Sequence, residues 1–268
     1  MQERHRNRQQ YFNEQSESTR GYVLPYIMQH ITEEKSVNEE PLRVLEIGCG
    51  EGGNLLPFLE AGYKCWGVEL FEINYRNALK FYEEHPLKLH LQLLNKNIYE
   101  VTPDEIGGAF DIVFLRDVIE HIPAQEQFMK HLKNFIAPNG VVFFAFPPWR
   151  MPFGGHQQTC LNKWLSKIPY MHILPIPVYK AILKIFGASN NKIEELLDIK
   201  KTGISIKRFE KIIRRENYVT IRKTYWFINP NYQVKFGLTP RRLPKIFQIP
   251  YIQDFYTTAV YYLLKVKG

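Results

Sequence analysis

Two carboxylates and a run of glycines in the first third of the chain have the spacing of a cofactor site. The run contains Gly48, Gly50, Gly52 and Gly53, which let a backbone turn tightly and approach a ligand without obstruction by a Cβ atom. Glu46 precedes the turn, and Glu69 lies 19 residues beyond Gly50. In nucleotide-binding α/β proteins a carboxylate at this distance binds the ribose hydroxyls. The pattern therefore predicts a site for a cofactor that carries a ribose.

Two cofactors fit this turn. The pattern Gly48-x-Gly50-x-x-Gly53 matches the dinucleotide fingerprint and would bind NAD. Glu46 stands in the arrangement Glu-x-Gly-x-Gly at the end of an apolar strand, and this favours S-adenosylmethionine, as does the acidic segment after the fourth predicted strand. A glycine-rich turn that binds no ligand is the remaining interpretation.

Two histidines follow later strands and could serve as catalytic residues. Asp117, Glu120 and His121 come directly after a strand predicted at 110–115, and His156 follows Gly154-Gly155 after a strand predicted at 141–146. Ligands of doubly wound sheets bind at the carboxyl ends of the strands, and imidazole titrates near neutral pH. Either histidine could therefore act as a base or orient an acceptor. Each could instead be structural, as a helix cap or a residue bonded to the backbone.

The predicted elements place these residues at one edge of a sheet. Strands are predicted at 43–47, 64–68, 89–93, 110–115 and 141–146, and helices at 54–60, 73–84 and 124–135. Strands that alternate with helices in this way predict an α/β, doubly wound parallel sheet. An amphipathic helix within 11–31 should pack on the sheet, and a helix at 205–217 precedes strands at 218–228 and 255–266.

The chain of 268 residues is long enough for one main core with an insertion. We expect an N-terminal helix and linker at 1–40, a cofactor-binding core at 41–149, an inserted lid at 150–202, and a C-terminal helix and strands at 203–268. Within the lid, the apolar run 168–187 lies between lysines. It could line an acceptor pocket, rest on a membrane surface, or pack over the sheet.

The charge is unevenly distributed. Residues 1–149 carry 14 Lys and Arg against 21 Asp and Glu, a net charge of −7, whereas residues 150–268 carry 21 against 6, a net charge of +15. A basic half with interleaved aromatic residues could meet nucleic acid, anionic lipid or an anionic small substrate, or could be an ordinary solvated surface.

The cysteines and the N-terminus indicate a reducing compartment. Cys49, Cys65 and Cys160 have neither the pairing of a disulfide framework nor the spacing of a zinc site, so we expect packed, reduced thiols. The first ten residues are polar, and no segment reaches the roughly 18 apolar residues of a membrane span. These features predict a cytoplasmic protein.

Four motifs, in order, resemble those of the class I S-adenosylmethionine-dependent methyltransferases, particularly the small-molecule branch that includes the ubiquinone and menaquinone biosynthetic enzymes. They are VLEIGCGEGG at 44–53, GVEL at 67–70, NKNI at 95–98 and FDIVFLRDVIEHI at 110–122. The resemblance covers roughly residues 41–149. It implies a Rossmann-like, seven-stranded sheet that is mostly parallel with an antiparallel last strand, and S-adenosylmethionine as the cofactor.

The resemblance also implies roles for the residues of the first two motifs. The backbone of Gly48, Cys49 and Gly50 would contact the methionine part of the cofactor, and Glu46 would help hold this loop. Glu69 would accept hydrogen bonds from both ribose hydroxyls.

The adenine and the amino group would meet residues further along. Leu70 and Phe71 would flank adenine, and Asn97 and Ile98 fall where the family often has an acid and an apolar residue beside it. The backbone carbonyl of Arg116 would accept from the cofactor's amino group, and Asp117 would open the active-site face beside it.

Taken together, the residues and the resemblance predict methyl transfer to a small-molecule acceptor, as O-methylation of a lipophilic or anionic metabolite. The alternatives are a methyltransferase of RNA or protein that uses the basic half, and a cofactor-binding scaffold without catalysis. We assign no metal ligands, although Asp117-x-x-Glu120-His121 is similar to the Glu-x-x-Glu-His of quinone-pathway members thought to use a divalent metal. Pro147-Pro148-Trp149 follows the fifth strand, not the fourth, which weakens the nucleic-acid alternative.

Overall fold

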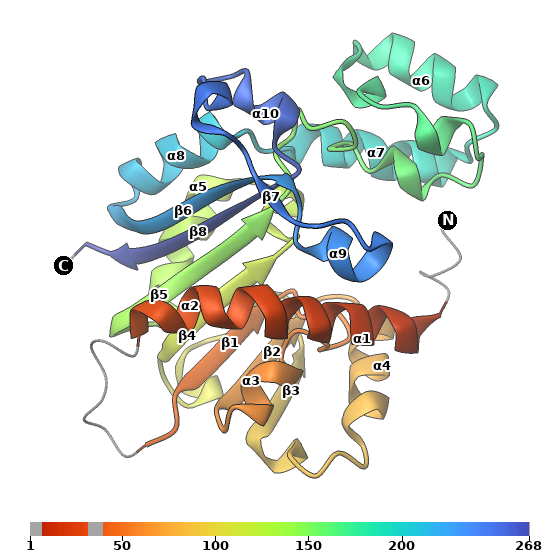
Figure 1. The fold of residues 1–268 in the computed structure, drawn as a ribbon. Coiled ribbons are helices and arrows are strands. Elements are labelled where there is room, and N and C mark those ends of the chain that lie inside the picture. Colours follow the sequence, from red (N-terminus) through yellow and green to blue (C-terminus); the bar gives the residue numbers. More distant parts are fainter. Residues whose placement is uncertain (1–6, 32–39, 268) are drawn as a thin grey trace.

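The computed structural model describes residues 7–31 and 40–267, so most of the linker expected before residue 40 lies outside the described residues. One eight-stranded sheet has the order β3-β2-β1-β4-β5-β8-β6-β7 (Figure 1). Its strands are β1 (Arg43–Ile47), β2 (Lys64–Glu69), β3 (Leu91–Asn95), β4 (Phe110–Arg116), β5 (Ile136–Phe146), β6 (Tyr218–Ile228), β7 (Arg241–Arg242) and β8 (Ala259–Val266).

The strand directions confirm the expected fold class. β1 pairs in parallel with β2 and β4, as β2 does with β3 and β4 with β5, whereas β8 runs antiparallel to both β5 and β6. The last strand, β8, is therefore antiparallel to the parallel set, and so is the short β7, which runs antiparallel to β6. The expected seven strands gain an eighth, β7, which pairs with the end of β6. Its two residues are too short to show any periodic pattern in the sequence.

Helices cover both faces of the sheet, as a doubly wound fold requires. They are α1 (Arg8–Ser18), α2 (Leu24–Ile31), α3 (Leu56–Glu60), α4 (Glu72–Tyr82), α5 (Gln125–Leu132), α6 (Ile176–Ile185), α7 (Asn190–Thr202), α8 (Ile206–Arg215), α9 (Asn231–Phe236) and α10 (Gln253–Tyr256). A π-helical segment, Thr19–Val23, joins α1 to α2. None of the helices within the described ranges is long and apolar enough to cross a membrane.

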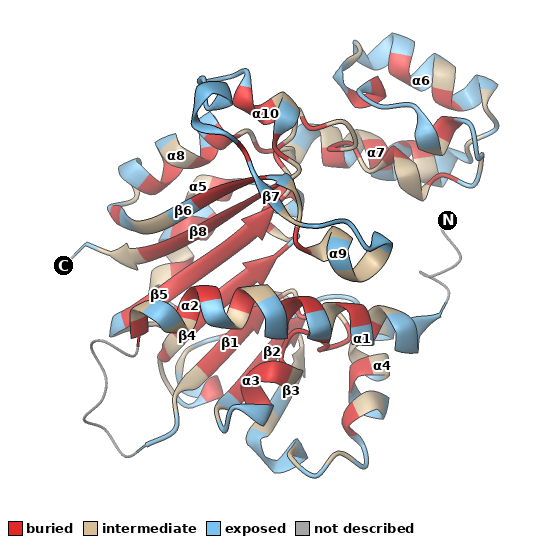
Figure 2. Cartoon of the chain, viewed as in Figure 1, coloured by how far each residue is buried: buried red, intermediate tan, exposed pale blue. Residues whose placement is uncertain are grey.

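The alternation of side chains along β4 separates two apolar layers. Val113 and Leu115 face one layer, which contains residues of α5 and α8, whereas Ile112 and Phe114 face the other, which contains residues of α1, α2 and α3. The strands are buried along most of their length (Figure 2). Burying each large apolar side chain contributes about 1.5–3 kcal/mol, so the sheet is a stable platform for the loops at its edge.

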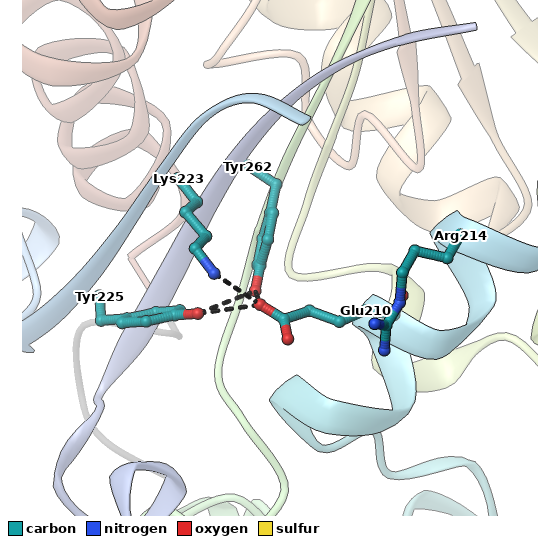
Figure 3. A network of polar contacts seen from close by, with 5 residues as sticks. All are labelled: Glu210, Arg214, Lys223, Tyr225 and Tyr262. Atoms are coloured by element: carbon teal, nitrogen blue, oxygen red, sulfur yellow. Dashed lines mark hydrogen bonds and ion pairs between the residues drawn. The ribbon is translucent and has the colours of Figure 1, made fainter. Parts of the chain in front are cut away.

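One polar network fastens α8 to the C-terminal strands (Figure 3). Glu210 accepts hydrogen bonds from Lys223 Nζ, Tyr225 Oη and Tyr262 Oη, each at 3.0 Å. Burial alone would raise the pKa of Glu210, but these three donors outweigh it and hold the pKa below its usual range. The network lets a carboxylate sit between a helix and the sheet without an unpaired charge.

The inserted segment 150–202 forms a helical layer with its own apolar cluster. The cluster contains Cys160, Leu165, Met171, Tyr179, Leu183, Ile193, Leu196 and Ile199. The buried part of the apolar run 168–187 therefore packs within this layer and not over the sheet. Because the segment follows β5, it lies beyond the carboxyl ends of the strands, where α6 and α7 project in Figure 1.

Candidate functional site

The glycine-rich turn joins β1 to α3 and has the left-handed backbone that glycine tolerates. Gly48 has a φ of +71°, and a Cβ atom there would lie 2.6 Å from Val118 Cγ2. Gly50 has a φ of +56°, and a Cβ atom there would meet nothing within 4 Å. The turn therefore packs tightly against the segment after β4 at Gly48 and opens to free space at Gly50.

Glu69 at the end of β2 closes on this turn, as its predicted role requires. Its Oε2 accepts from Gly50 N at 2.7 Å, and its Oε1 accepts from Phe71 N at 2.8 Å. Asn95 Nδ2 donates to the carbonyls of Glu69 at 2.8 Å and Leu70 at 3.1 Å, which fixes the end of the strand. A carboxylate has about four acceptor sites, so Glu69 can still accept two hydroxyl donors.

The residues expected around adenine occupy two environments. Leu70 is 58% and Phe71 64% exposed, which is unusual for large apolar side chains next to a buried carboxylate. Ile98 is buried after β3, the strand that pairs with β2. Asn97 caps the turn that Ile98 begins, because its Oδ1 accepts from Tyr99 N at 3.2 Å.

Glu46 holds the far end of the glycine turn. It is fully buried, and its Oε1 accepts from Asn54 Nδ2 at 2.7 Å. Burial raises the pKa of Glu46 well above its usual range, against the opposing effects of Asn54 and Arg116. Arg116 Nη1 in turn donates to Asn54 Oδ1 at 2.9 Å. The side chain of Arg116 therefore braces the turn, which leaves its backbone for the predicted contact with the cofactor.

The same arginine ties the turn to the N-terminal helices. Arg116 donates to Thr19 Oγ1 at 3.0 Å and to Ser18 Oγ at 2.8 Å, where the π-helical segment begins. Thr19 also donates to Asn54 Oδ1 at 2.8 Å. Ser18, Thr19 and Asn54 were not among the predicted site residues. Their only signal in the sequence was that Ser18 and Thr19 form a pair of hydroxyl residues within an otherwise amphipathic helix.

Cys49 contributes only its backbone to the surface of the turn. Its side chain is buried, and a Cβ atom on Gly67 of β2 would lie 2.7 Å from Cys49 Sγ. The thiol therefore packs on β2, and burial raises its pKa well above the usual range. Cys49, Cys65 and Cys160 are all buried and form no disulfide within the described residues, as expected for packed, reduced thiols.

A second group of residues gathers where β4 and β5 end. Glu120 and His121 lie in the 3-10 turn Ile119–His121 after β4, and His156 comes from the loop after β5. One ligand atom from each lies within 4.8 Å of the others, and the two imidazole rings are 4.9 Å apart between centroids. The structure thus brings the two predicted histidines together, and Glu120 lies beside them.

Glu120 is the unusual member of this cluster. Its side chain is 3% exposed, and neither carboxylate oxygen has a hydrogen-bond partner among the described residues. The nearest basic group is His121 Nε2, 4.0 Å from Oε1. Burial and the charge of Asp117 raise the pKa of Glu120 well above its usual range. A buried carboxylate without donors is costly, so this site favours a bound positive charge.

The loop that carries His156 is held in place by its neighbours. A Cβ atom on Gly154 would lie 2.3 Å from Trp149 O, and one on Gly155 would lie 2.1 Å from His172 Cβ. His172 Nε2 is 2.6 Å from Trp149 O, which locks this contact. His156 itself has a φ of +57°, an uncommon conformation that costs on the order of 1–3 kcal/mol and often marks a functional residue.

The pKa values of both histidines of the cluster lie below the usual value for imidazole. Burial lowers the pKa of His156 to about 3, with a smaller contribution from His121. Burial also lowers the pKa of His121, against the opposing charge of Asp117, although its side chain is 41% exposed. A neutral imidazole with a pKa of about 3 is a weak base at neutral pH but a competent metal ligand.

Asp117 lies between the glycine turn and the cluster. Its neighbour Val118 packs on Gly48, and its own charge acts on His121 and Glu120. Asp117 is exposed and has a φ of +55°, so the chain turns sharply as β4 ends. The segment after β4 therefore contacts the glycine turn through Val118 and carries Glu120 and His121 of the cluster.

Trp149 of the diproline element is half-buried against His172 and Gly203. Its ring lies 4.6 Å from that of His172 between centroids, and a Cβ atom on Gly203 would be 2.2 Å from it. An aromatic ring that stacks on a flipped base must be accessible. This position of Trp149 counts against that use of the diproline element.

Comparisons with known proteins identify the family of this chain. Residues 20–193 match the family model described as a methyltransferase domain. The ubiquinone biosynthesis O-methyltransferase of Rickettsia canadensis (strain McKiel) is 23% identical over 220 residues, which are 80% of this chain and 81% of that protein. The protein of the same name from Rickettsia akari (strain Hartford) is 28% identical over 122 residues, 46% of this chain and only 47% of the relative.

Solved structures share the fold at lower identity. An S-adenosylmethionine-dependent methyltransferase from Clostridium acetobutylicum has a TM-score of 0.57 at 12% identity, covering 94% of this chain and 92% of that chain. Geranyl diphosphate C-methyltransferase from Streptomyces coelicolor, solved with Mg²⁺, geranyl diphosphate and S-adenosyl-L-homocysteine, has a TM-score of 0.55 at 12% identity, covering 91% and 80%. With its matched domain, its turn and its sheet, this chain belongs to the methyltransferase-domain family and is an S-adenosylmethionine-dependent methyltransferase.

Proposed function

We propose that this enzyme methylates an oxygen atom of a small-molecule acceptor with a lipophilic or anionic character, and that Glu120, His121 and His156 hold a divalent cation next to that oxygen. The observation that carries the proposal is the buried Glu120 carboxylate, which has no hydrogen-bond partner among the described residues and faces two neutral imidazoles. The Rickettsia relatives named as O-methyltransferases support the choice of oxygen.

The residues of the cluster fit a cation better than they fit a general base. One carboxylate and two imidazoles form a donor set that suits divalent transition metals, and a cation would remove the cost of the unpaired Glu120 charge. When bound, a divalent cation supplies Lewis acidity that lowers the pKa of an acceptor hydroxyl. The sequence led us to assign no metal ligands. We now propose that both histidines bind the metal, and that neither abstracts a proton.

The donor half of the reaction uses the glycine turn and Glu69. The backbone at Gly48, Cys49 and Gly50 would receive the methionine part of the cofactor, and Glu69 would accept from the ribose hydroxyls in addition to its two amide bonds. The carbonyl of Arg116 and the exposed carboxylate of Asp117 would meet the amino group.

The adenine would then lie beyond Glu69. The exposed side chains of Leu70 and Phe71 would cover one part of it, and Asn97 and Ile98 would meet its edge from the end of β3. Covering two large apolar side chains that are more than half exposed would contribute to cofactor affinity.

Transfer itself is an in-line displacement. The acceptor hydroxyl gives up its proton to solvent, and its oxygen forms a bond to the methyl carbon as the carbon–sulfur bond breaks. The electron pair of the broken bond stays on sulfur, giving neutral S-adenosylhomocysteine. Alignment of donor and acceptor supplies much of the acceleration in such a reaction. Glu120 and His121 follow Asp117 in the segment after β4, so an acceptor at the cluster would lie near the proposed cofactor contacts of Arg116 and Asp117.

Calorimetric titration tests the cation site without relying on turnover. Mg²⁺, Mn²⁺ and Zn²⁺ are added in turn to the protein saturated with S-adenosylhomocysteine. We expect at least one of them to bind with one equivalent per chain, and we expect His121→Ala and His156→Ala to weaken it at least about tenfold, as loss of a ligand does. An exposed histidine variant, His90→Ala, is the control. Failure of all three cations to bind the wild-type protein contradicts the metal part of the proposal.

We also propose that the inserted layer rests on an anionic membrane surface, as the run 168–187 suggested. Its exposed apolar residues continue across a second segment, and together they form an apolar rim. The rim consists of Ile168, Ile173, Ile176, Val178, Ile246, Phe247, Ile249, Tyr251, Ile252 and Tyr256, all at least 38% exposed. Tyr170 joins the two segments by donating to Phe255 O at 3.2 Å. Such an extended apolar surface on a monomer marks an interaction site.

Basic residues beside the rim support an anionic partner. Lys207 Nζ lies 4.0 Å from the ring centroid of Tyr251, and the Arg150 guanidinium lies 5.8 Å from it. Cations next to exposed apolar side chains bind anionic lipid through combined burial and charge. We expect co-sedimentation with anionic vesicles to fall in Ile176→Glu and Ile249→Glu. It should not fall in Leu89→Glu, at an exposed position of the 3-10 helix Lys88–His90 before β3. Equal sedimentation of all variants would show that the apolar rim does not bind the vesicles.

A further inference from the structure

We infer that the short junction between α7 and α8 holds both halves of the metal-ligand cluster in place, and that Gln125 and Trp149 are the positioning residues that connect it to them. The junction consists of Thr202, the last residue of α7, with Gly203 and Ile204. The use of the cluster as a cation site rests on the proposed function, whereas the contacts of the junction do not depend on it.

Gln125, at the start of α5, connects the junction to the half of the cluster that follows β4. Its side chain is 1% exposed, and its Nε2 donates to Ile119 O at 3.0 Å and to Thr202 O at 2.7 Å. Ile119 begins the 3-10 turn that carries Glu120 and His121. Both donors of the side-chain amide are therefore used to fix this turn to the end of α7.

Trp149 connects the junction to the half of the cluster that follows β5. Its backbone N donates to Ile204 O at 2.8 Å, and a Cβ atom on Gly203 would lie 2.2 Å from Trp149 Cε3. Trp149 O would in turn lie 2.3 Å from a Cβ atom on Gly154, two residues before His156. Trp149 therefore lies between the junction and the loop that presents His156.

The helix before the junction adds contacts to both halves. α7 packs against the 3-10 turn after β4. Lys200, in the last turn of α7, donates through Nζ to the carbonyl oxygens of His172 and Leu174. His172 packs on Gly155, the residue before His156. The end of α7 is therefore fixed to the loops of both strands.

These contacts make the two halves of the cluster depend on each other. Loops at the ends of neighbouring strands can open separately unless another element ties them together. Since the junction contacts both, a displacement at Gln125 should reach the loop of His156, and a displacement at Trp149 should reach the turn of His121. Such coupling is reciprocal, so a cation bound to the cluster should stabilise the docked junction by the factor by which docking raises cation affinity.

Amide hydrogen exchange of the metal-free protein tests the coupling without any cation. Gln125→Leu keeps the bulk of the side chain and removes both donors. Gly203→Ala forces Trp149 to move, although a φ of −46° suits alanine. We expect Gln125→Leu to speed exchange within 150–156, and Gly203→Ala to speed it within 118–122, each at least about tenfold. Each variant is thus measured in the half that it does not touch.

Two control variants make the same changes where no such contact exists. Gln127→Leu lies at an exposed position of α5, and a Cβ atom on Gly21 would meet nothing within 4 Å, so Gly21→Ala has room. Both should exchange as the wild type does, and unchanged exchange in β1 and β2 shows that a variant is folded. Exchange that rises only in the half that a substitution touches overturns the inference.

The absorption spectrum of bound Co²⁺ reports the arrangement of the ligands directly, because the bands of this ion depend on its coordination geometry. We expect Gln125→Leu and Gly203→Ala to alter this spectrum and to weaken Co²⁺ binding at least about tenfold, as loss of a residue that orients metal ligands does. The affinity for S-adenosylhomocysteine should stay the same. Gln127→Leu and Gly21→Ala should keep the wild-type spectrum.

The two measurements separate this inference from the proposed function. A wild-type protein that binds no divalent cation contradicts the cation site, and exchange of the metal-free variants still decides whether the junction couples the two loops. A wild-type spectrum and Co²⁺ affinity in both Gln125→Leu and Gly203→Ala overturn the positioning role and leave the cation site in place.

Discussion

Replacing Glu120 by glutamine should stabilise the metal-free protein. Glu120 is 3% exposed and lacks a hydrogen-bond partner among the described residues. An unpartnered buried polar group costs about 1–3 kcal/mol, and more when it is charged. Glu120→Gln keeps the shape of the side chain and removes the charge. We expect the free energy of unfolding at pH 7.5 to rise by about 1–3 kcal/mol. In a chain of this size, each kcal/mol of added stability raises the Tm by roughly 2–4 °C.

The pH dependence follows from the same pKa shift. Burial raises the pKa of Glu120 in the folded protein above its unfolded value, so the folded state holds this proton more tightly. The corresponding stability is present below the unfolded pKa of about 4.5 and is lost as pH rises through the folded pKa. Between the unfolded and the folded pKa, the free energy of unfolding of the wild-type protein should therefore fall relative to that of Glu120→Gln. Below the unfolded pKa, the two free energies of unfolding should become similar.

A cation should reverse the order of the two proteins. A ligand that binds only the folded state adds about 2.7 kcal/mol when its concentration is 100 times the Kd. With Mn²⁺ we expect the Tm of the wild type to rise and that of Glu120→Gln to stay nearly constant. Glu84→Gln, an exposed position after α4, controls for the loss of one negative charge. A Glu120→Gln variant that is less stable than the wild type without metal, and that responds equally to Mn²⁺, would refute this reasoning.

Three further substitutions test the site. Glu69→Gln replaces an acceptor for two backbone amides and the proposed ribose contact, so the Kd for S-adenosylhomocysteine should rise about 10–100-fold in calorimetry. Gly155→Ala would put a Cβ atom 2.1 Å from His172 Cβ and displace His156, so cation binding should fall at least about tenfold with S-adenosylhomocysteine affinity retained. Arg116→Met removes the hydrogen bonds to Ser18, Thr19 and Asn54, and Glu46 loses its nearby cation. The free energy of unfolding, measured by urea denaturation, should therefore fall by about 3–5 kcal/mol. An unchanged value in any of these three measurements contradicts the contact concerned.

The sequence allowed the sheet and the cofactor turn to be predicted because local patterns specify both. The strands β1 and β6 have the expected bounds, Arg43–Ile47 and Tyr218–Ile228, since each is rich in β-branched, aromatic or other apolar residues and is followed by a turn signal. Gly48 and Gly50 have the positive φ that a tight turn requires. In contrast, β7 has only two residues, and its pairing with β6 depends on tertiary packing.

The bracing of the turn could not be predicted, because its partners are far apart in the chain. Arg116 reaches Asn54 over 62 positions and Ser18 over 98. The sequence favoured a backbone role for Arg116 and gave no sign of where its side chain points. The π-helical segment Thr19–Val23, which follows Ser18, also has no pattern that separates it from the α-helices on either side.

The metal-ligand cluster shows the same limit. Glu120 and His121 are adjacent in the sequence, but His156 joins them only because Gly154 and Gly155 pack on Trp149 and His172. The left-handed φ of His156 is set by those contacts and not by its own preference. The sequence therefore indicated both histidines as separate candidates, and it placed Glu120 next to His121, but it did not show that His156 joins these two residues.

The most direct test is turnover with S-adenosylmethionine labelled in its methyl group and an alkyl catechol as acceptor. We predict an O-methylated catechol and S-adenosylhomocysteine in equal amounts, loss of this activity on treatment with a chelator, and its recovery on addition of Mg²⁺ or Mn²⁺. Label transferred only to RNA or protein, or O-methylation that is unaffected by the chelator, would contradict the account.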